Sequence, residues 1–594
     1  MSDKKRALLS VFYKDGIVEF AKALIELGFE IVSSGGTAKH LIKEGVEGVI
    51  DVADITGVPA ILSHRVVTLN HKIYAGILAE LTPEHDADLE QFAAERFDIV
   101  CCDVYPVMEA LTAGRVSVAK VMNMTDIGGP CMLRASAKNH NNCVTPICDP
   151  ADRQRVIDDI IDFGRVTTVL NTELCGKTFD MTARYDAAIR NFMMAESGQL
   201  VDSIFLSNGQ RLAYAENRDQ NEAYIFSDGS DDPLAIHNFE VESGKPSYIS
   251  YADGDQLIDI LCIMTEAFRR FTGVPHIALA GKHGNPCGAG VSFHSPEVAI
   301  EKALMGDPVA VMGGEVVTNF PIDSYRGKKL FKTDGLLDGK RYYRGKWGLD
   351  IVFAPSFEGD SVEVLGEYQK RRLLSNPNLE EAFMNSAQWV LRPVRGGFLR
   401  QKRATYVPSM DSFHEWAVMT GADRTAFVNL VIAWATCWRA SSNTVALAKN
   451  KMLIGLGCGQ QDRIACVRLC VNRALGAGHS LRGSYFASDG FFPYCEGKLE
   501  LIEKRKLSAA IKALQKASNT KDRYERNRLA IDSVVNTLLP LDFREGPEIL
   551  RDNGCTGGIV PGDGKNLPLV KKFFNDAGMK VLFLPPIHRG FSKH

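Results

Sequence analysis

The neighbouring residues Lys282 and His283 are of the types that can move a proton and hold a developing negative charge. They follow the apolar run His276–Ala280, which reads as a buried strand, and they precede a loop rich in Gly and Pro. Histidine suits general base chemistry near neutral pH, and a desolvated lysine can stabilise an oxyanion. The pair therefore indicates a catalytic loop at a strand end. The alternative is an exposed loop with two unrelated polar residues.

A second group of residues could bind a phosphate. The small-residue loop Ser33–Thr37 connects a strand-like run, Phe29–Val32, to a helix that opens near Thr37. Glycines let backbone N–H groups approach a ligand closely, and a helix N-terminus favours an anion. Lys14 and Lys39 could add positive charge. This pattern indicates a phosphate cradle, and an ordinary β–α turn of small residues is the alternative.

Polar residues at further strand ends form a third group. The apolar run Asp98–Tyr105 ends in polar residues, and a Gly-rich segment, Asp126–Gly129, follows later. Ligands of open α/β sheets bind at the carboxyl ends of the strands. Tyr105, Asp126 and Lys138 are therefore candidate site residues, although each taken singly is more often a solvated or capping residue.

The elements around these residues alternate between strands and helices. Ala7–Val11 reads as a strand, Ile17–Leu27 places apolar residues at helical spacing, and Phe29–Val32 is the next strand. Such a β–α–β order implies a parallel sheet. Further along, a helical stripe in Leu257–Phe268 precedes the strand at His276–Ala280. The sequence therefore predicts an α/β protein.

Composition narrows the class of protein. The 594 residues suggest about four domain-sized units at roughly 150 residues each. Lys plus Arg is 69 and Asp plus Glu is 72, so the net charge of −3 argues against nucleic-acid binding through bulk charge. A charged N-terminus, and apolar runs shorter than the ~20 residues of a membrane helix, indicate a cytoplasmic protein. The 14 cysteines form no C-x-x-C pair, which favours reduced, buried thiols.

Several motifs are more specific in combination than singly, because they occur together and in a fixed order along the chain. In the first part of the chain they are Ser33–Lys39, Ala75–Leu78, Tyr105–Pro106, Asp126–Gly129 and Leu133–His140. In the second part they are Lys282–Gly288, which fits Lys-His-x-x-Pro-x-Gly, and then Gly306–Pro308, Asp350–Pro355, Ser442–Asn450, Ile454–Arg463, Ser488–Tyr494 and Arg589–His594. This set resembles the bifunctional purine-biosynthesis enzymes that combine AICAR transformylase with IMP cyclohydrolase, and the resemblance covers nearly the whole chain.

The resemblance implies a domain organisation. Residues 1–200 are expected to form a methylglyoxal-synthase-like cyclohydrolase domain with a parallel sheet. Residues 201–375 and 376–594 are expected to form two cytidine-deaminase-like α/β lobes of the transformylase, with active sites built across a homodimer. A basic, helix-prone insertion near residues 498–540 is interpreted as a solvated amphipathic helix, and a nucleic-acid or partner site is the alternative.

The same resemblance implies two reactions on small molecules. A formyl group moves from the cosubstrate 10-formyltetrahydrofolate to AICAR, giving FAICAR, and FAICAR then closes to IMP with loss of water. The H-x-E…P-C-x-x-C signature of zinc deaminases is absent, so neither zinc nor another metal ligand set is expected. A potassium ion near Ser442 is left open. No nucleic-acid or membrane partner is expected.

Site residues carry over from the family position by position. The catalytic residues expected are Lys282, His283 and Asn443 for formyl transfer, and Lys138, Asp126 and Tyr105 for ring closure. The AICAR-binding residues expected are Tyr214, Gly313, Asp350, Asn443, Arg463, Glu496 and Arg589, and the folate-binding residues are Ile464, Phe491, Gly564 and Lys565. The IMP- and FAICAR-binding residues expected are Lys14, Ser34, Gly35, Gly36, Thr37, Arg65, Thr68, Cys102, Asp103, Asp126 and Ile127.

The sequence departs from the family pattern in the first part of the chain. Val67 stands where the family has a lysine, Asn70 where it has a histidine, and Phe12 replaces a small hydroxyl residue. These changes motivate an alternative function: a monofunctional AICAR formyltransferase whose N-terminal domain binds nucleotide without efficient ring closure. A catalytically dead nucleotide sensor is a third reading, against which the intact Lys282 and His283 speak.

Two further departures concern the AICAR site. Ala213 stands where the family has an arginine, with Arg211 two residues away. The AICAR-binding carboxylate could come from Glu496 or from Glu545, because an insertion separates the two halves of the expected motif. Glu496 is preferred since it needs no realignment.

Overall fold

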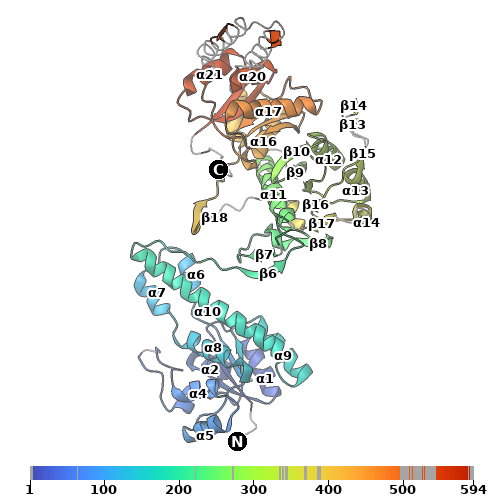
Figure 1. Cartoon of the computed structure of the whole chain (residues 1–594). Coiled ribbons are helices and arrows are strands. Elements are labelled where there is room, and N and C mark those ends of the chain that lie inside the picture. The colour runs from blue at the N-terminus through green and yellow to red at the C-terminus, as the bar shows by residue number, and fades with distance from the viewer. Residues whose placement is uncertain are drawn as a thin grey trace. The chain divides into compact units, whose positions relative to one another are not determined.

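The chain folds into two compact units, Met1–Phe205 and Leu206–His594, each described here by itself (Figure 1). The computed structural model describes residues 5–62, 65–142, 144–217, 219–220, 222–269, 273–333, 336–337, 340–341, 345–366, 371–383, 389–495, 508, 511–512, 515, 525, 527–528, 544–585 and 588. Glu496, Arg589 and most of the insertion near 498–540 therefore lie outside the described residues.

The first unit is built on a parallel five-stranded sheet with the order β3-β2-β1-β4-β5. Its strands are β1 (Lys5–Ser10), β2 (Phe29–Ser33), β3 (Ile50–Asp51), β4 (Ile99–Cys102) and β5 (Thr145–Ile147). The predicted β–α–β start of the chain is confirmed. Gly28, just past the first helix, has φ 86°, a left-handed conformation that favours glycine after a helix end.

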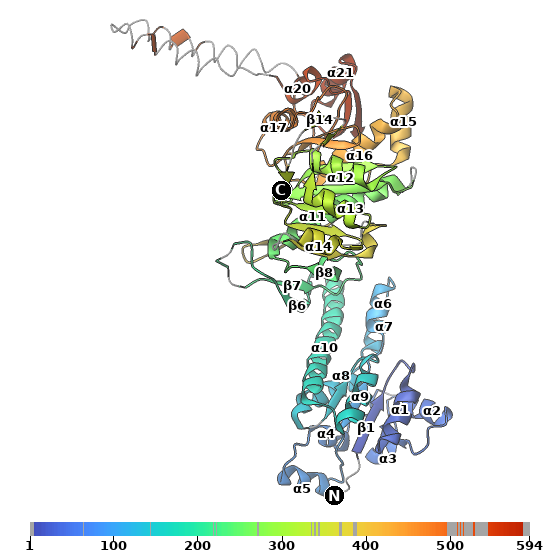
Figure 2. The same cartoon turned by 90° about the vertical axis from the view of Figure 1, so that its right-hand side faces the viewer.

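Helices cover both faces of this sheet, as a parallel sheet requires (Figure 2). The helices are α1 (Ile17–Glu26), α2 (Gly35–Lys43), α3 (Val52–Thr56), α4 (His71–Leu78), α5 (Pro83–Gln91), α6 (Val107–Thr112), α7 (Val118–Met124), α8 (Gly128–Lys138), η1 (His140–Asn142), α9 (Asp152–Phe163) and α10 (Thr168–Glu196). Residues of α1, α9 and α10 share one apolar core, and residues of α4 and α8 share the other.

The second unit is built on one eleven-stranded sheet with the order β24-β23-β22-β20-β21-β10-β9-β11-β16-β17-β8. In chain order its strands are β8 (Glu240–Ser243), β9 (His276–Lys282), β10 (Asn285–Ser292), β11 (Glu315–Thr318), β16 (Ile351–Ala354), β17 (Arg372–Ser375), β20 (Val445–Lys449), β21 (Met452–Gly457), β22 (Tyr485–Ser488), β23 (Gly557–Pro561) and β24 (Lys580–Leu584). The two hairpins β9–β10 and β20–β21 meet at the centre, where Gly290 of β10 lies opposite Met452 of β21.

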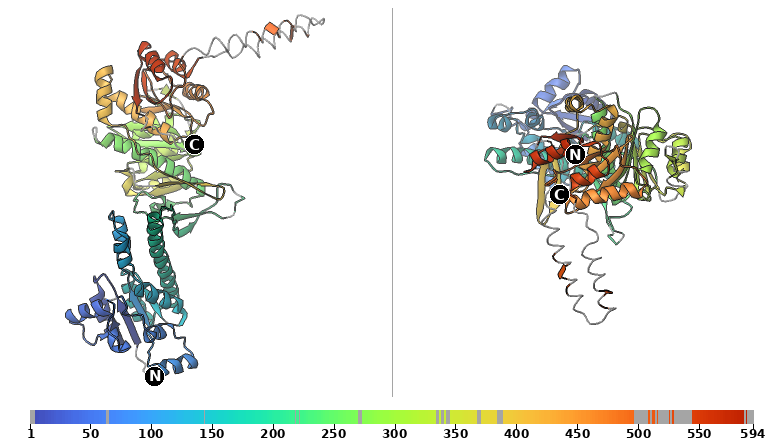
Figure 3. Two further views of the ribbon diagram at one scale, coloured as in Figure 1. Left: turned by 90° about the vertical axis from the view of Figure 1, so that its left-hand side faces the viewer. Right: turned by 90° about the horizontal axis from the view of Figure 1, so that it is seen from above.

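The two halves of this sheet repeat one pattern, helix–hairpin–helix. Figure 3 shows the second unit, coloured from green to red, from two further sides. On one face lie α11 (Tyr248–Arg269), α15 (Met410–Thr420) and α16 (Arg424–Arg439). On the other lie α12 (Pro296–Met305), α13 (Ser324–Phe331), α14 (Ser361–Gly366), α17 (Arg463–Gly476), α20 (Gly546–Asp552) and α21 (Leu567–Asp576). Each apolar core contains residues from both halves, so the halves are packed as one body.

The second unit also contains short strand pairs and short helices. They are the strand pairs β6 (Ser207–Arg211) with β7 (Tyr224–Ser227), β12 (Lys332–Thr333) with β15 (Gly345–Lys346), β13 (Leu336–Leu337) with β14 (Lys340–Arg341) and β18 (Trp389–Val394) with β19 (Gly397–Lys402), together with η2 (Ile236–Asn238) and η3 (Pro377–Leu379). The predicted α/β class holds for both units.

Two candidate active sites

A cavity of about 1130 Å³ opens in the first unit, at the carboxyl ends of β1, β2 and β4 and beside the start of α8. This is the edge where ligands of open α/β sheets bind. The expected IMP- and FAICAR-site residues that line it are Lys14, Ser34, Gly35, Gly36, Thr37, Arg65, Thr68, Asp103, Tyr105, Asp126 and Ile127. Five segments that are distant in sequence therefore converge on one cavity.

The loop before α2 forms the anion-binding part of this cavity. Ser34 precedes the helix in an extended conformation, and its Oγ lies 2.6 Å from the Oγ of Ser10. The Nζ of Lys14 donates a hydrogen bond to the Oγ1 of Thr37 at 3.1 Å. Burial lowers the pKa of Lys14, and the charge of Asp103 opposes that shift. A helix N-terminus and an ammonium group thus face the same space, which suits a phosphate.

The opposite wall of the cavity carries the acidic groups. Asp126 accepts a hydrogen bond from the backbone N–H of Gly129 at 3.1 Å, and a Cβ at position 129 would lie 2.5 Å from its carboxylate. Burial raises the pKa of Asp126, of Asp103 and of Tyr105, each above its ordinary value. A carboxyl group with raised proton affinity, inside a cavity, is suited to exchange a proton with a ligand.

Two expected residues do not line this cavity. Cys102 ends β4 and is buried, with its Sγ donating to the backbone carbonyl of Asp103 at 3.2 Å. Lys138 is the exposed last residue of α8, about 15 Å along the helix from Gly128 at ~1.5 Å per residue. Within one chain, Lys138 therefore does not meet Asp126, and its role stays a prediction.

Two of the departures from the family pattern line the cavity itself, Phe12 and Val67. The ring of Phe12 packs edge-to-face on Tyr105, with ring centroids 5.6 Å apart. Val67 adds an apolar side chain to the wall. The missing lysine therefore changes the chemistry of the cavity directly.

In the second unit, one edge of the eleven-stranded sheet collects the expected transformylase residues. Strand β9 runs antiparallel to β11, so Lys282 at the end of β9 lies beside Gly313, just before β11. Strand β16 is parallel to β11, which places Asp350 at the same edge. The Nζ of Lys282 donates to the carbonyl of Met312 at 2.6 Å, and the N–H of Asp350 donates to the carbonyl of Gly314 at 3.0 Å.

The turn that joins β9 to β10 contacts a loop from the other half of the sheet. His283 is exposed in this turn and has a left-handed conformation, with φ 54°. The side-chain oxygen of Asn285 accepts a hydrogen bond from the N–H of Ser441 at 3.1 Å. Asn443 is held two residues further on, where its Nδ2 donates to the carbonyl of Gln460 at 2.7 Å. The loop 441–444 therefore lies against the turn that carries His283.

A buried ion pair organises the same loop. Arg463, at the start of α17, pairs with Asp489, and only 9% of the arginine side chain is exposed. Asp489 also accepts hydrogen bonds from the Oγ of Ser442 at 2.5 Å and from the N–H of Thr444 at 3.0 Å. The charge of Arg463 is thus already compensated inside the protein.

The expected folate residues and the two candidate carboxylates lie in the second half of this unit. A Cβ at Gly564 would lie 2.8 Å from the ring of Phe491, so the loops after β22 and β23 touch. Ile464 is partly buried in α17, and Lys565 is exposed. Glu545 is buried and forms a capping box with Glu548 at the start of α20. Glu496 lies outside the described residues, so the choice between Glu496 and Glu545 as the AICAR carboxylate stays a prediction.

Sequence reasoning missed two residues at this edge. Arg372, the first residue of β17, donates from Nη2 to the hydroxyl of Tyr214 at 3.1 Å. Glu315, the first residue of β11, is buried, and burial, followed by the charges of Asp253 and Asp350, raises its pKa to about 9. Neither residue belongs to a recognisable motif. The only hint of Arg372 in the sequence was indirect: Ala213 stands where the family has an arginine, so a cation from elsewhere could take its place.

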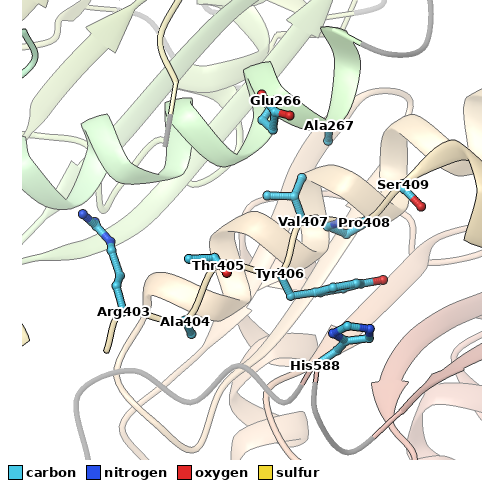
Figure 4. Close-up of a pocket in the computed structure, with 10 residues that line it drawn as sticks. All are labelled: Glu266, Ala267, Arg403, Ala404, Thr405, Tyr406, Val407, Pro408, Ser409 and His588. Carbon is cyan, nitrogen blue, oxygen red and sulfur yellow. The ribbon is translucent and has the colours of Figure 1, made fainter. Parts of the chain in front are cut away.

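A second cavity, of about 580 Å³, lies between α11 and the loop Arg403–Ser409 (Figure 4). The ring of Tyr406 stacks on that of His588 with centroids 4.0 Å apart. No expected site residue that the structure describes lines this cavity.

Two features are absent from the part of the chain that the structure describes. Among the described parts of the chain, no group of three or more His, Cys, Asp and Glu side chains is arranged to hold a metal ion. No helix within the described ranges combines the length and the apolar character needed to cross a membrane.

Comparison with known proteins gives concordant matches. The sequence model described as AICARFT/IMPCHase bienzyme matches residues 136–473, and that described as MGS-like domain matches residues 16–131. The bifunctional purine biosynthesis protein PurH of Bacillus cytotoxicus is 33% identical over 496 residues, 82% of this chain and 90% of that protein. PurH of Bacillus mycoides is 34% identical over 498 residues, with the same two shares. The crystal structure of ForH is 30% identical and covers 33% of this chain and 99% of its own, with a TM-score of 0.30.

These matches extend across both units. The bienzyme match spans 473 − 136 + 1 = 338 of 594 residues, more than half of the chain. The expected methylglyoxal-synthase-like character of the first unit is confirmed by its own match. The chain therefore belongs to the AICARFT/IMPCHase bienzyme family, which carries AICAR formylation, with its folate-type formyl donor, and IMP ring closure on one polypeptide.

Proposed function

We propose that the edge of the eleven-stranded sheet formylates AICAR and that the cavity of the first unit closes FAICAR to IMP. The observation that carries this assignment is the junction between the turn bearing Lys282 and His283 and the loop bearing Asn443. It brings a cation, an imidazole and a side-chain amide from opposite halves of the sheet to one edge.

Formyl transfer needs help because the AICAR amine is a weak nucleophile, its lone pair being delocalised into the ring. The amine nitrogen attacks the formyl carbon of 10-formyltetrahydrofolate, and His283 accepts the proton that the nitrogen loses. Lys282 stabilises the oxyanion of the tetrahedral intermediate. The bond from the formyl carbon to the folate nitrogen then breaks, tetrahydrofolate leaves with a proton on that nitrogen, and Asn443 keeps the formyl group oriented.

Ring closure is intramolecular and depends mainly on holding FAICAR folded. Lys14 and the loop Ser34–Thr37 hold the 5′-phosphate, since they supply an ammonium group and a helix N-terminus. The carboxamide nitrogen attacks the formyl carbon, and water leaves. Asp126, whose pKa burial raises, moves protons around that carbon with help from Tyr105.

One observation favours a second candidate function. Val67 and Phe12 line the cavity where the family pattern has a lysine and a small hydroxyl residue. In this alternative the chain is an AICAR formyltransferase whose first unit binds nucleotide but does not close the ring efficiently. The two readings differ only in the rate of IMP formation.

Our proposal extends to properties that rest on the family resemblance alone. These are a cytoplasmic homodimer that binds no nucleic acid, the division of the second unit near residue 376, and formyl transfer without zinc. A potassium ion beside Ser442 is testable by measuring the transformylase rate after exchange of potassium for sodium.

A two-product assay tests the proposal. The full chain is supplied with AICAR and 10-formyltetrahydrofolate, and FAICAR and IMP are followed separately. His283→Ala should lower FAICAR formation by about 100-fold or more while IMP formation from added FAICAR is retained. His414→Ala, an exposed histidine on α15, is the matched control. Full transformylase activity in His283→Ala would remove His283 as the base, and FAICAR accumulating without IMP in the unmodified chain would select the alternative function.

A further inference from the structure

Arg372 presents a guanidinium group that the protein holds without a carboxylate. Its Nε donates to the carbonyl of Lys245 at 3.1 Å, and its Nη2 donates to the hydroxyl of Tyr214 at 3.1 Å. The guanidinium carbon also lies 5.7 Å from the centre of the Tyr214 ring. Among the described residues, none of these contacts neutralises the positive charge. Within the described part of the chain, the group is therefore oriented without a carboxylate partner.

Two other arginines of the second unit are used differently. Arg371 is buried and donates to the carbonyls of Leu349 and Leu365 at 2.9 and 2.8 Å, which ties β17 to its neighbours. Arg463 is paired with the buried carboxylate of Asp489. A phosphate is bound most strongly by a guanidinium whose N–H groups and charge are still available. Arg372 meets this requirement better than Arg463 does.

Arg372 also lies at the proposed transformylase edge. Its backbone N–H donates to the carbonyl of Asp350 at 2.9 Å, so it directly adjoins an expected AICAR residue. Strand β17 is separated from β9 by β11 and β16, which puts Arg372 about 14 Å along the edge from Lys282 at ~4.8 Å per strand. AICAR itself has its reacting amine on the base and its 5′-phosphate at the far end of the ribose. The edge thus offers a reacting group and a free cation at two separated points.

We propose that Arg372 binds the 5′-phosphate of AICAR, with Tyr214 orienting the guanidinium group. The inference rests on the proposed transformylase function and explains how the chain manages with Ala213 at the family's arginine position. Ala213 is adjacent to Tyr214 in sequence and is exposed, so an arginine there would extend from the same segment as the tyrosine that contacts Arg372. The cation is then supplied by a neighbouring strand instead of by the segment that carries the tyrosine.

The test compares AICAR with its 5′-dephosphorylated riboside as substrates of the full chain. Arg372→Ala should raise the KM for AICAR about 10- to 100-fold, because a charge-assisted contact to phosphate is lost. The KM for the folate and the weak use of the riboside should change little. The KM of Arg372→Lys for AICAR should lie between those of the unmodified chain and of Arg372→Ala, because an ammonium group cannot form the paired hydrogen bonds of a guanidinium. Lys245→Ala, which removes an exposed cation from the adjoining segment, is the matched control.

A rescue variant separates binding from folding. Ala213→Arg introduced into Arg372→Ala should recover most of the lost preference for AICAR over the riboside, which a purely structural role of Arg372 would not allow. A rise of both substrates' KM by the same factor, without loss of that preference, would overturn the proposal. If the unmodified chain forms no FAICAR, the proposed function fails, and calorimetric titration of AICAR and the riboside into the same variants still decides whether Arg372 holds the phosphate.

Discussion

Val67 is the departure from the family pattern that replaces a positively charged residue in the lining of the first unit's cavity. It lines the cavity of the first unit where a lysine would add a cation near the ligand. We expect Val67→Lys to raise kcat/KM for the conversion of FAICAR to IMP by about 10-fold or more, because a fixed cation stabilises charge that develops during closure. The measurement is the initial rate of IMP formation.

Leu69→Lys is the control for Val67→Lys, because Leu69 lines the same cavity at a different point. An equal rise in both variants would mean that any added charge attracts the substrate. No rise in either would show that ring closure does not need this cation.

Glu315 gives the second unit a pH-dependent stability. Burial, followed by the charges of Asp253 and Asp350, raises its pKa from 4.5 to about 9. The folded protein therefore holds a proton that the unfolded chain releases, so stability falls as pH rises through this window, by at most ~1.4 kcal/mol per pH unit from this group. Glu315→Gln should remove that slope.

The measurement is the free energy of unfolding in urea between about pH 5 and about pH 9. The difference in stability between Glu315→Gln and the unmodified chain should grow with pH. Glu358→Gln, at an exposed glutamate, should leave the slope as it is. Parallel pH profiles for Glu315→Gln and the unmodified chain would mean that Glu315 is ionised in the folded protein.

Candidate site residues at the ends of strands could be predicted from the sequence. Residues whose role depends on which strands become neighbours could not. Lys14 follows β1 of a recognisable β–α–β pattern, so the rule that ligands bind at carboxyl ends located it in the cavity. Arg372 and Glu315 begin strands in a mixed sheet, where function depends on which strands become neighbours. Lys138 was grouped with Asp126 by sequence motif, but it is the last residue of α8 and lies about 15 Å along the helix from Gly128 at ~1.5 Å per residue.

At the scale of elements, the packing of α17 on β21 holds Arg463 and Ile464 at the proposed transformylase edge. A Cβ at Gly457 would lie 2.1 Å from the backbone carbonyl of Cys466 in α17. Gly457→Ala should therefore push the helix away, lower stability by about 1–3 kcal/mol and reduce formyl transfer. Ring closure should persist, because the other unit carries it.

Thermal unfolding and the two-product assay check this variant together. Gly476→Ala, at the last residue of the same helix, is the control because nothing lies within 4 Å of its Cβ position. That change should be neutral or slightly stabilising, since alanine has the higher helix propensity. Normal formyl transfer in Gly457→Ala would show that the helix can shift without disturbing the site.

Local elements were predictable because each has its own periodicity. The apolar stripes at Ile17–Leu27 and Leu257–Phe268 became α1 and the buried face of α11, and His276–Ala280 became most of β9. The joining of both halves into one sheet was not predictable. The pairing of β10 with β21 connects residues about 160 positions apart through a single pair, Gly290 and Met452, and no local pattern encodes it.

At the scale of the whole molecule, each unit carries its own candidate site, so the two reactions should be separable. A mixture of His283→Ala and Asp126→Asn chains should convert AICAR to IMP, with a lag while FAICAR accumulates in solution and reaches the second chain. Each variant alone should stop at a different point: before FAICAR for His283→Ala, and after it for Asp126→Asn. Absence of IMP from the mixture, with each remaining single activity intact, would contradict independent sites.

The central pairing of β10 with β21 also bears on ancestry. A half-sheet by itself would end in an uncovered strand, and such strands seek partners. A precursor with one half would have joined a second copy of itself through that strand, with identical loops meeting at the seam. Doubling of its gene would then have turned a contact between molecules into one within a chain and freed the paired loops to diverge, one toward lysine and histidine and the other toward asparagine.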